Sequence, residues 1–327
     1  MRILFIGIRY HTYTQAIIDE MELLGADVTF VDIQPRSLFF KVYRTLSRSL
    51  YQNFTRQHLQ AAVEATHGIS YDKVVFLQVH QMELDTLQYL RQCQPQAEFS
   101  LYNWDAITTH DYCNHATLFD RVLTFDRRDA AEYGFGYLPL FCSRSFQSLA
   151  IPKEQPGSVY MVGNIVQLAR YHAVEAFRDY CVREGLTFRQ YLKISPVVLA
   201  KALRSGVRPR GVKLGSISQP AFREMVESST AAFDFANHSQ SGQTMRMMES
   251  LCAGKKVITN NTWVRQEPFY SPDRIHVFED LDFSGIAAFM DIPIAEPEAH
   301  FPEYTIQAFT RRFIGLAPVS TLRGSHV

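Results

Sequence analysis

The sequence has no excess of charge of either sign and no long apolar run. Lys plus Arg and Asp plus Glu both number 33 among its 327 residues. Because proteins that coat DNA or RNA are usually strongly basic, this balance argues against nucleic acid as a partner. No window approaches the roughly 18 uncharged apolar residues that a membrane-spanning helix needs. The apolar run over 3–7 also lacks the length and cleavage site of a signal peptide, so we expect a buried first strand there.

Patterns for disulfides and metal sites are missing as well. The cysteines are odd in number, scattered and without a C-x-x-C pair: Cys93, Cys113, Cys142, Cys181 and Cys252. We therefore expect reduced thiols in a cytoplasmic protein, with neither a disulfide framework nor a zinc site. No H-x-x-H occurs, and the D-x-D over 280–282 precedes a helical pattern over 283–289 that it is better placed to cap. We expect no metal.

What the sequence does have is a regular alternation of strand and helix patterns. In the first half, strands are predicted over 3–8, 27–33, 73–79, 98–102 and 121–125, with helices over 14–24, 82–92 and 127–133. In the second half, strands are predicted over 158–163, 231–235 and 256–259, with helices over 172–184 and 244–253. Such βαβ units form parallel sheets. We predict two Rossmann-like, doubly wound α/β domains.

The Pro- and Gly-punctuated segment 150–157 is the best candidate for a linker. It divides the chain into domains of 1–150 and 151–327. Two similar α/β halves usually bind ligand in the cleft between them, so we expect them to face one. The helical pattern over 304–316 is a candidate to cross back onto the first domain.

Two long stretches contain no acidic residue. Residues 33–63 mix five basic side chains with aromatic and aliphatic ones, which fits either a basic helix touching a membrane surface or a surface helix packed on the core. Residues 185–223 include Arg189, Lys193, Lys201 and Arg204. This second stretch fits either a site for phosphate or an anionic acceptor, or a solvated basic face.

The most informative segment runs from 237 to 261. A strand pattern is followed by a polar turn containing Ser241 and Gly242, and then by a helix that Thr244 can cap. The free N–H groups and dipole of such a helix start attract anions. Arg246 and Glu249 are three residues apart and so share a face. An Arg for phosphate and a Glu for ribose hydroxyls suit a nucleotide diphosphate.

The run T-x-R-x-x-E-x-L-x-x-G-x-K-x-I-T-x-N, from Thr244 to Asn261, resembles the donor-binding motif of GT-B glycosyltransferases. It is most similar to the bacterial group with CgeB-like proteins and lipopolysaccharide and capsule transferases. The resemblance implies that Glu249 holds the donor ribose, and that the strand end and basic residue at Gly163 and Arg170 belong to the same site. The donor-binding set is then Gly163, Arg170, Ser241, Gly242, Thr244, Arg246 and Glu249. Ser241 stands where the retaining E-x7-E signature has its first Glu, so stereochemistry stays open.

Candidates for catalysis lie in the first domain, where the segments 102–105 and 120–125 also resemble that group. Asp105 follows a strand end and is placed to deprotonate an acceptor hydroxyl, although an Asx turn would equally explain it. His11 lies in the loop after the first strand, where open α/β sheets bind ligands; it is either a base, a contact to donor phosphates, or without a role. Trp104 is either a stacking platform for a sugar or a core residue.

Together these features predict a metal-independent glycosyltransferase that uses a nucleotide sugar and no further cofactor. The resemblance implies a glycan or lipid-linked acceptor in bacterial surface polysaccharide synthesis, and a cytoplasmic protein at the inner face of the membrane through peripheral contact. One alternative is a non-catalytic nucleotide-sugar or glycan-binding protein on the same fold. A third reading, an NAD-dependent oxidoreductase, lacks the G-x-G-x-x-G fingerprint.

Overall fold

The computed structural model describes residues 1–10, 12–34, 48–147, 157–236, 240–293 and 301–317. By contacts the chain divides into two compact units. Unit 1 comprises the described residues of Met1–Pro139, Ser239–Gly242 and Thr305–Val327, and unit 2 those of Leu140–His238 and Gln243–Tyr304. Unit 2 thus begins before the predicted linker, most of which lies outside the described residues.

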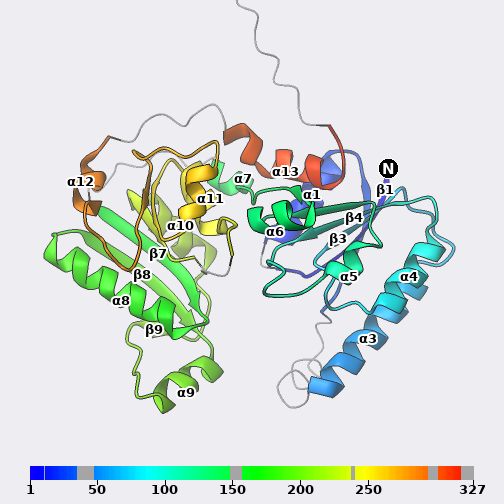
Figure 1. The fold of residues 1–327 in the computed structure, drawn as a ribbon, viewed down its shortest axis with the longest axis horizontal. Helices are drawn as coiled ribbons and strands as arrows, with labels where there is room; N and C mark the ends of the chain where they lie inside the picture. Colours follow the sequence, from blue (N-terminus) through cyan, green and yellow to red (C-terminus); the bar gives the residue numbers. More distant parts are fainter. Residues whose placement is uncertain (11, 35–47, 148–156, 237–239, 294–300, 318–327) are drawn as a thin grey trace, which may run out of the picture. The chain divides into compact units, whose positions relative to one another are not determined.

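Unit 1 is built on a parallel sheet whose described strands are ordered β2-β1-β3-β4-β5-β6 (Figure 1). The strands are β1 (Arg2–Gly7), β2 (Asp27–Asp32), β3 (Lys73–Leu77), β4 (Glu98–Asn103), β5 (Arg121–Thr124) and β6 (Gly136–Tyr137). After β2 the chain returns to the other side of β1, so the order reverses between β1 and β3. Open sheets bind ligands at the carboxyl ends of strands beside such a reversal.

Helices cover both faces of this sheet. They are α1 (Tyr13–Leu23), α3 (Arg48–Glu64), α4 (Leu84–Cys93), α5 (Cys113–Ala116), α6 (Arg127–Tyr133) and α13 (Ile306–Phe313). On one face, apolar residues of α3 and α4 pack with Leu4, Phe76 and Leu101. On the other face α13 lies against α1 and sends Phe309 and Phe313 onto the ring of Tyr102. The last described helix therefore belongs to unit 1 (Figure 1).

Unit 2 repeats the plan with the described order β12-β11-β10-β7-β8-β9. Its strands are β7 (Ser158–Ile165), β8 (Thr187–Ile194), β9 (Val212–Lys213), β10 (Ala231–Asp234), β11 (Lys256–Thr259) and β12 (Ile275–Val277). Its helices are α7 (Arg144–Gln147), α8 (Leu168–Arg183), α9 (Pro196–Arg204), α10 (Gln219–Glu227), α11 (Met245–Cys252) and α12 (Ile286–Asp291), with 3-10 turns η1 (Thr262–Gln266) and η2 (Phe301–Tyr304). Here the order reverses between β7 and β10.

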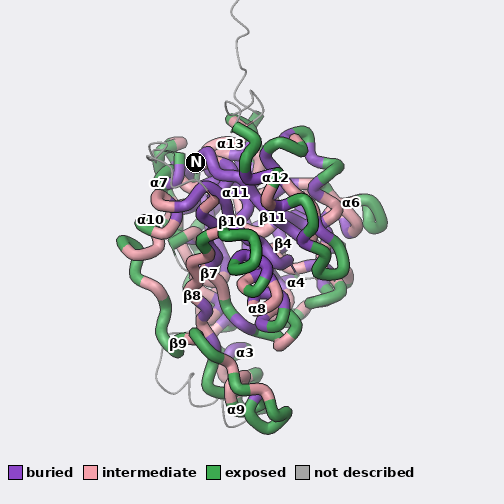
Figure 2. The backbone as a smooth tube through the Cα atoms, turned by 90° about the vertical axis from the view of Figure 1, so that its left-hand side faces the viewer, coloured by how far each residue is buried: buried purple, intermediate pink, exposed green. Residues whose placement is uncertain are grey.

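The core of unit 2 forms where α8 and α12 pack on the sheet. A stack of rings runs through it, with Phe177 on Phe233 at 4.1 Å between centroids and Phe233 on Phe278 at 5.5 Å. The other face carries a smaller cluster in which Val226 of α10 and Phe146 of α7 pack with Tyr160. The central strands β7, β10 and β11 are accordingly deeply buried, whereas β8 and β9 are mostly half-buried or exposed (Figure 2).

The predicted fold class is confirmed: both units are parallel, doubly wound α/β sheets. Every strand predicted from an apolar run is present, displaced by no more than two residues at either end. The strand β8 was not predicted, because its sequence TFRQYLKI alternates polar and apolar residues and resembles the surrounding basic stretch. Its alternation fits its place beyond β7, next to the two-residue β9.

The expectation of reduced thiols was wrong for one pair. Cys142 and Cys252 form a disulfide, with their Cα atoms 6.2 Å apart, while Cys93, Cys113 and Cys181 are free. The two partners are 110 residues apart and meet because α11 packs beside α7. No spacing rule in the sequence could have found a pairing that depends on tertiary packing.

Candidate functional site

In unit 2 the predicted turn-and-helix segment is organised around one buried carboxylate. Asp234, the last residue of β10, is completely buried. Thr244 caps α11 by accepting from the Met247 N–H at 3.1 Å, and its hydroxyl donates to Asp234 Oδ1 at 2.7 Å. Thr259 of β11 donates to the other oxygen at 3.3 Å. The helix start is thereby fixed to the carboxyl ends of two strands.

Arg246 completes this arrangement. Its Nη1 lies 2.5 Å from Asp234 Oδ1, and its Nε donates to the Val162 carbonyl at 2.8 Å. A Cβ on Gly163 would stand 2.8 Å from Arg246 Nη2, so the glycine leaves the space that the guanidinium occupies. The side chain is only 13% exposed. Arg246 therefore ties β7, β10 and α11 together, and the sequence could not show that Asp234 would hold it.

Glu249 lies one turn further along α11, on the face that carries Arg246. It is 2% exposed. Its neighbour Ser250 shares a hydrogen bond of 2.7 Å with the hydroxyl of Tyr160 on β7. Burial raises the pKa of Tyr160, and the negative charge of Glu249 contributes to the rise. The predicted ribose-binding residue thus lies beside β7, close to the reversal of strand order.

Gly163 and Arg170 belong to the same edge of the sheet. Gly163 lies near the carboxyl end of β7, and Arg170 lies in the first turn of α8. Arg170 Nη1 donates to the carbonyl of Asn164 at 2.9 Å, which holds the side chain over that strand end. The structure therefore brings together five of the predicted donor residues: Gly163, Arg170, Thr244, Arg246 and Glu249.

Ser241 and Gly242 are placed elsewhere, within unit 1. The N–H and hydroxyl of Ser241 both donate to the Asp126 carboxylate at 2.6 Å, and Asp126 also caps α6. A Cβ on Gly242 would lie 2.2 Å from the ring of Phe125. Both residues are specialised for close packing on the start of α6, which explains their residue types without a ligand.

In unit 1 Asp105 is held by side-chain amides. Gln78 Nε2 donates to Asp105 Oδ2 at 2.6 Å, and Gln240 Nε2 approaches Oδ1 at 3.5 Å. Gln78 directly follows β3 and adopts φ of 66°, a conformation that non-glycine residues rarely take. Its backbone N–H donates to the Tyr102 carbonyl at 3.0 Å. Such strain concentrates at functional positions, and sequence reasoning missed this residue.

Aromatic side chains surround the same edge. Tyr10 lies edge-on to Trp104 at 5.9 Å between ring centroids, and Tyr13 lies 6.5 Å from it. Trp104 is half-buried and so presents part of its ring. His11, the other predicted catalytic residue, lies outside the described residues, and its role stays a prediction.

Two histidines stack near Asp105. The rings of His80 and His110 are parallel at 3.9 Å between centroids. Burial lowers the pKa of His80 to about 4, and the charges of His110 and His115 add to the effect. His80 follows β3, and His110 follows β4, so neighbouring strand ends bring them together. The sequence shows polar residues after each of two buried strands, but it does not show that these strands are neighbours in the sheet.

The depressed pKa of His80 predicts that the free energy of unfolding falls in acid. Because the folded state depresses the pKa of His80, the unfolded chain takes up a proton near pH 6.5 and the folded chain only near pH 4. The contribution of neutral His80 is complete above about pH 6.5 and is lost as the pH falls through about 4. Allowing for solvent screening, the loss is about 1–2 kcal/mol.

Urea unfolding near neutral pH and near pH 4 measures this loss directly. His80→Gln should reduce the difference between the two conditions by about 1–2 kcal/mol, the share assigned to His80. The exposed His67→Gln is the matched control and should keep it. An unchanged pH dependence in His80→Gln would contradict the assignment.

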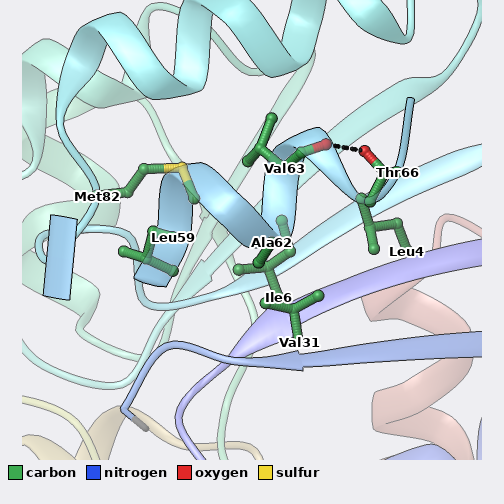
Figure 3. Close-up of a pocket in the computed structure, with 8 residues that line it drawn as sticks. All are labelled: Leu4, Ile6, Val31, Leu59, Ala62, Val63, Thr66 and Met82. Atoms are coloured by element: carbon green, nitrogen blue, oxygen red, sulfur yellow. Dashed lines mark hydrogen bonds between the residues drawn. The ribbon is translucent and has the colours of Figure 1, made fainter. Parts of the chain in front are cut away.

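Three further features, namely metal-ligand groups, the D-x-D segment and a pocket beneath α3, do not point to a ligand site in the described residues. Among the described residues no group of three or more His, Cys, Asp and Glu side chains could hold a metal ion. Asp282 of the D-x-D accepts from the Ser284 N–H at 2.9 Å, a local turn before α12. A pocket beneath α3 (Figure 3) is lined by Leu4, Ile6, Val31, Leu59, Ala62, Val63, Thr66 and Met82. Its one hydroxyl, on Thr66, already donates to Val63, so it offers nothing to a nucleotide.

Comparison with known proteins was made at the level of sequence and of structure. No family model and no curated protein matches the sequence. Solved structures do match. WaaB, a lipopolysaccharide outer core galactosyltransferase, aligns with a TM-score of 0.52 and 15% identity over 96% of this chain and 95% of that one. An alpha-glucosyltransferase solved with UDP and a 13-mer DNA aligns with a TM-score of 0.62 and 11% identity over 94% of both chains.

A third structure agrees with these two. HepE from Anabaena, solved with UDP-glucose, aligns with a TM-score of 0.57 and 11% identity over 96% of this chain and 98% of that one. The chain has the GT-B fold. At these identities the likeness is one of fold, and it extends over nearly the whole chain rather than over one Rossmann-like unit.

The helices of this GT-B chain were also compared with the requirements of a membrane span. None of them, in the part of the chain that the structure describes, is both long enough and apolar enough to cross a bilayer.

Proposed function

We propose that the chain is a metal-independent glycosyltransferase that transfers a sugar from a nucleotide-sugar donor. The observation that carries this proposal is the buried Asp234–Arg246 pair, which fixes the start of α11 at the reversal of strand order in unit 2. Ligands of open α/β sheets bind at such a reversal, and a fixed helix start offers N–H groups to a diphosphate. The GT-B fold and the UDP-bound neighbour are in keeping with this.

The donor residues have separate roles in this proposal. Glu249 accepts hydrogen bonds from the ribose hydroxyls, and the start of α11 at Thr244 receives the diphosphate. Arg170 supplies positive charge at the carboxyl end of β7, where it donates to the Asn164 carbonyl. Gly163 keeps the strand end open, and Ser241 and Gly242 shape the chain just before the helix. Positive charge and oriented N–H groups stabilise the nucleoside diphosphate as it leaves with the bonding electron pair.

The acceptor binds unit 1 in this proposal. Asp105 takes the proton from the acceptor hydroxyl while the acceptor oxygen forms a bond to the anomeric carbon of the donor sugar. Gln78 orients the carboxylate through its 2.6 Å hydrogen bond. His11 is a second candidate for proton transfer or for contact with the donor phosphates. A single well-placed base is sufficient for an inverting transfer.

We further propose that the transferase acts in surface polysaccharide synthesis. Its acceptor would be a glycan or a lipid-linked glycan, and the protein would contact the inner face of the membrane peripherally. WaaB, which shares the fold, acts in the lipopolysaccharide outer core by its name. The basic stretch around Arg44 and Arg48 is the part of unit 1 proposed to touch lipid. Arg44 lies outside the described residues, and Arg48 is the first residue after that gap. Liposome binding that is unchanged when Arg44 and Arg48 are replaced would contradict this contact.

Release of nucleoside diphosphate from a panel of nucleotide sugars tests the activity. UDP-sugars are tried first, because two of the matching structures hold UDP or UDP-glucose. A glycosyltransferase should release UDP, with or without added acceptor, and Glu249→Ala should abolish the release. Binding of a donor without release or transfer would favour the alternative, a nucleotide-sugar-binding protein on the same fold.

A further inference from the structure

The segment that follows β8 carries basic residues and almost no balancing charge. Between Glu184 and Glu224 the sequence has no acidic residue. Lys201, Arg204, Arg208, Arg210 and Lys213 are all exposed. In the described part of the chain none of these five forms an ion pair with a carboxylate, whereas Arg178 and Arg223 nearby do. The segment therefore presents concentrated, unneutralised positive charge.

The same segment exposes aliphatic side chains. The inner side of α9 packs on the core of unit 2 through Val198, Leu199 and the fully buried Ala202. On its outer side Val197 is 74% exposed and Leu203 is 52% exposed, and Leu214 beyond it is 59% exposed. These three are the large apolar side chains exposed between 187 and 223. In Figure 2 the tube over α9 is coloured mainly as exposed.

We propose that the exposed residues of 197–214, the α9 surface, dock on a bilayer containing anionic lipid. Lysine and arginine meet the lipid phosphates, and Val197, Leu203 and Leu214 enter the apolar layer beneath them. Exposed aliphatic side chains set among basic ones are suited to lie in the interface of an anionic membrane. Nucleic acid is a poorer fit, because single strands are bound by stacking on aromatic rings and no aromatic side chain is among the exposed residues here.

The α9 surface begins at a functionally important edge of unit 2. β8 pairs with β7 from Ser158↔Thr187 to Ile165↔Ile194, so the two strands end together. Ser195, which caps α9 by accepting from the Val198 N–H, follows directly. Docking would thus bring the carboxyl edge of the sheet, with Gly163, toward the lipid. The surface is separate from residues 33–63 of unit 1, and the proposal does not rest on the assigned enzyme activity.

Sedimentation of the full chain with vesicles tests the proposal. Vesicles of phosphatidylcholine with phosphatidylglycerol should bind the wild type, and vesicles of phosphatidylcholine alone should bind it far less. The double variant Leu203→Ser/Arg204→Glu should weaken binding about tenfold or more, since one attraction becomes a repulsion and one apolar anchor is lost. The matched control is Val182→Ser/Arg183→Glu at the C-terminal end of α8, where Val182 is 76% exposed. This control also replaces one exposed aliphatic side chain by serine and one arginine by glutamate. It should bind the vesicles like the wild type.

A second variant, Lys213→Glu/Leu214→Ser, lies outside the helix and guards against loss of binding by misfolding. Thermal unfolding of each variant checks that the fold is kept. Equal binding by wild type and both α9-surface variants, or an equal loss in the control, would overturn the proposal. Binding of the wild type to duplex DNA but not to the anionic vesicles, with the same variants failing to bind that DNA, would assign the surface to nucleic acid instead and equally overturn it.

Discussion

Replacing Asp105 by asparagine is expected to lower donor turnover by roughly 10²–10⁴-fold, the usual contribution of a positioned general base. Asparagine keeps the shape of the side chain and can still accept from Gln78, which donates at 2.6 Å in the wild type. It cannot take a proton from the acceptor. Because Asp105 lies in unit 1 and the proposed donor residues Arg170 and Glu249 lie in unit 2, donor binding should persist. The measurement is nucleoside diphosphate release at saturating donor.

Asp111→Asn is the matched control for this variant. Asp111 lies six residues along the same loop, and its carboxylate accepts from the Cys113 N–H at 2.9 Å. Its turnover should stay within a few-fold of the wild type. Full activity in Asp105→Asn would show that Asp105 is not the base, and the candidate would then be His11. An equal fall in both variants would point to damage to the loop instead.

Replacing Arg246 by methionine is expected to destabilise unit 2 by about 3–5 kcal/mol, the cost of breaking a buried ion pair. Asp234 would remain completely buried, and among the described residues the side-chain donors left to it would be the hydroxyls of Thr244 and Thr259. The helix α11 would also lose the hydrogen bond from Arg246 to the Val162 carbonyl. Urea unfolding measures the change in the free energy of unfolding.

The control for this prediction is Arg223→Met. Arg223 pairs with Glu227 at 2.6 Å on the surface of α10, and exposed pairs contribute at most about 1 kcal/mol. Adding Asp234→Asn to Arg246→Met should restore part of the lost stability, because the uncompensated carboxylate is then gone. Equal effects of the Arg246 and Arg223 variants would contradict the structural role assigned to the buried pair.

The sequence predicted the architecture well because parallel strands buried on both faces are apolar runs, and such runs are recognisable without knowledge of their partners. It missed β8, whose lysine and glutamine positions made it resemble a surface segment. The sequence offered residues 304–316 only as a candidate to cross back onto the first domain. The assignment of residues 305–317 to unit 1 depends on which face the aromatic side of α13 meets.

The candidate site was predictable only in part. A spacing of three residues was enough to place Arg246 and Glu249 on one helix face. Nothing in the spacing showed that Arg246 would pair with Asp234, because that contact is made between a helix and the preceding strand. The motif that resembles the donor-binding motif of GT-B transferases therefore includes residues that hold the fold, and a motif alone does not separate these from residues that meet a ligand.

Residues outside any motif were missed altogether. Gln78 and His80 follow β3 and reach Asp105 and His110 after β4, across adjacent strands of the sheet. Their proximity is set by strand order, which the sequence does not state. The disulfide between Cys142 and Cys252 was missed for the same reason.

Thermal unfolding with UDP, GDP, CMP, TDP and NAD tests whether unit 2 holds a nucleotide sugar at the start of α11. A ligand at a hundredfold excess over its dissociation constant stabilises the native state by about 2.7 kcal/mol. One nucleoside phosphate should raise the unfolding temperature of the wild type and leave that of Glu249→Ala unchanged. No rise with any nucleotide, or a rise with NAD alone, would contradict the account.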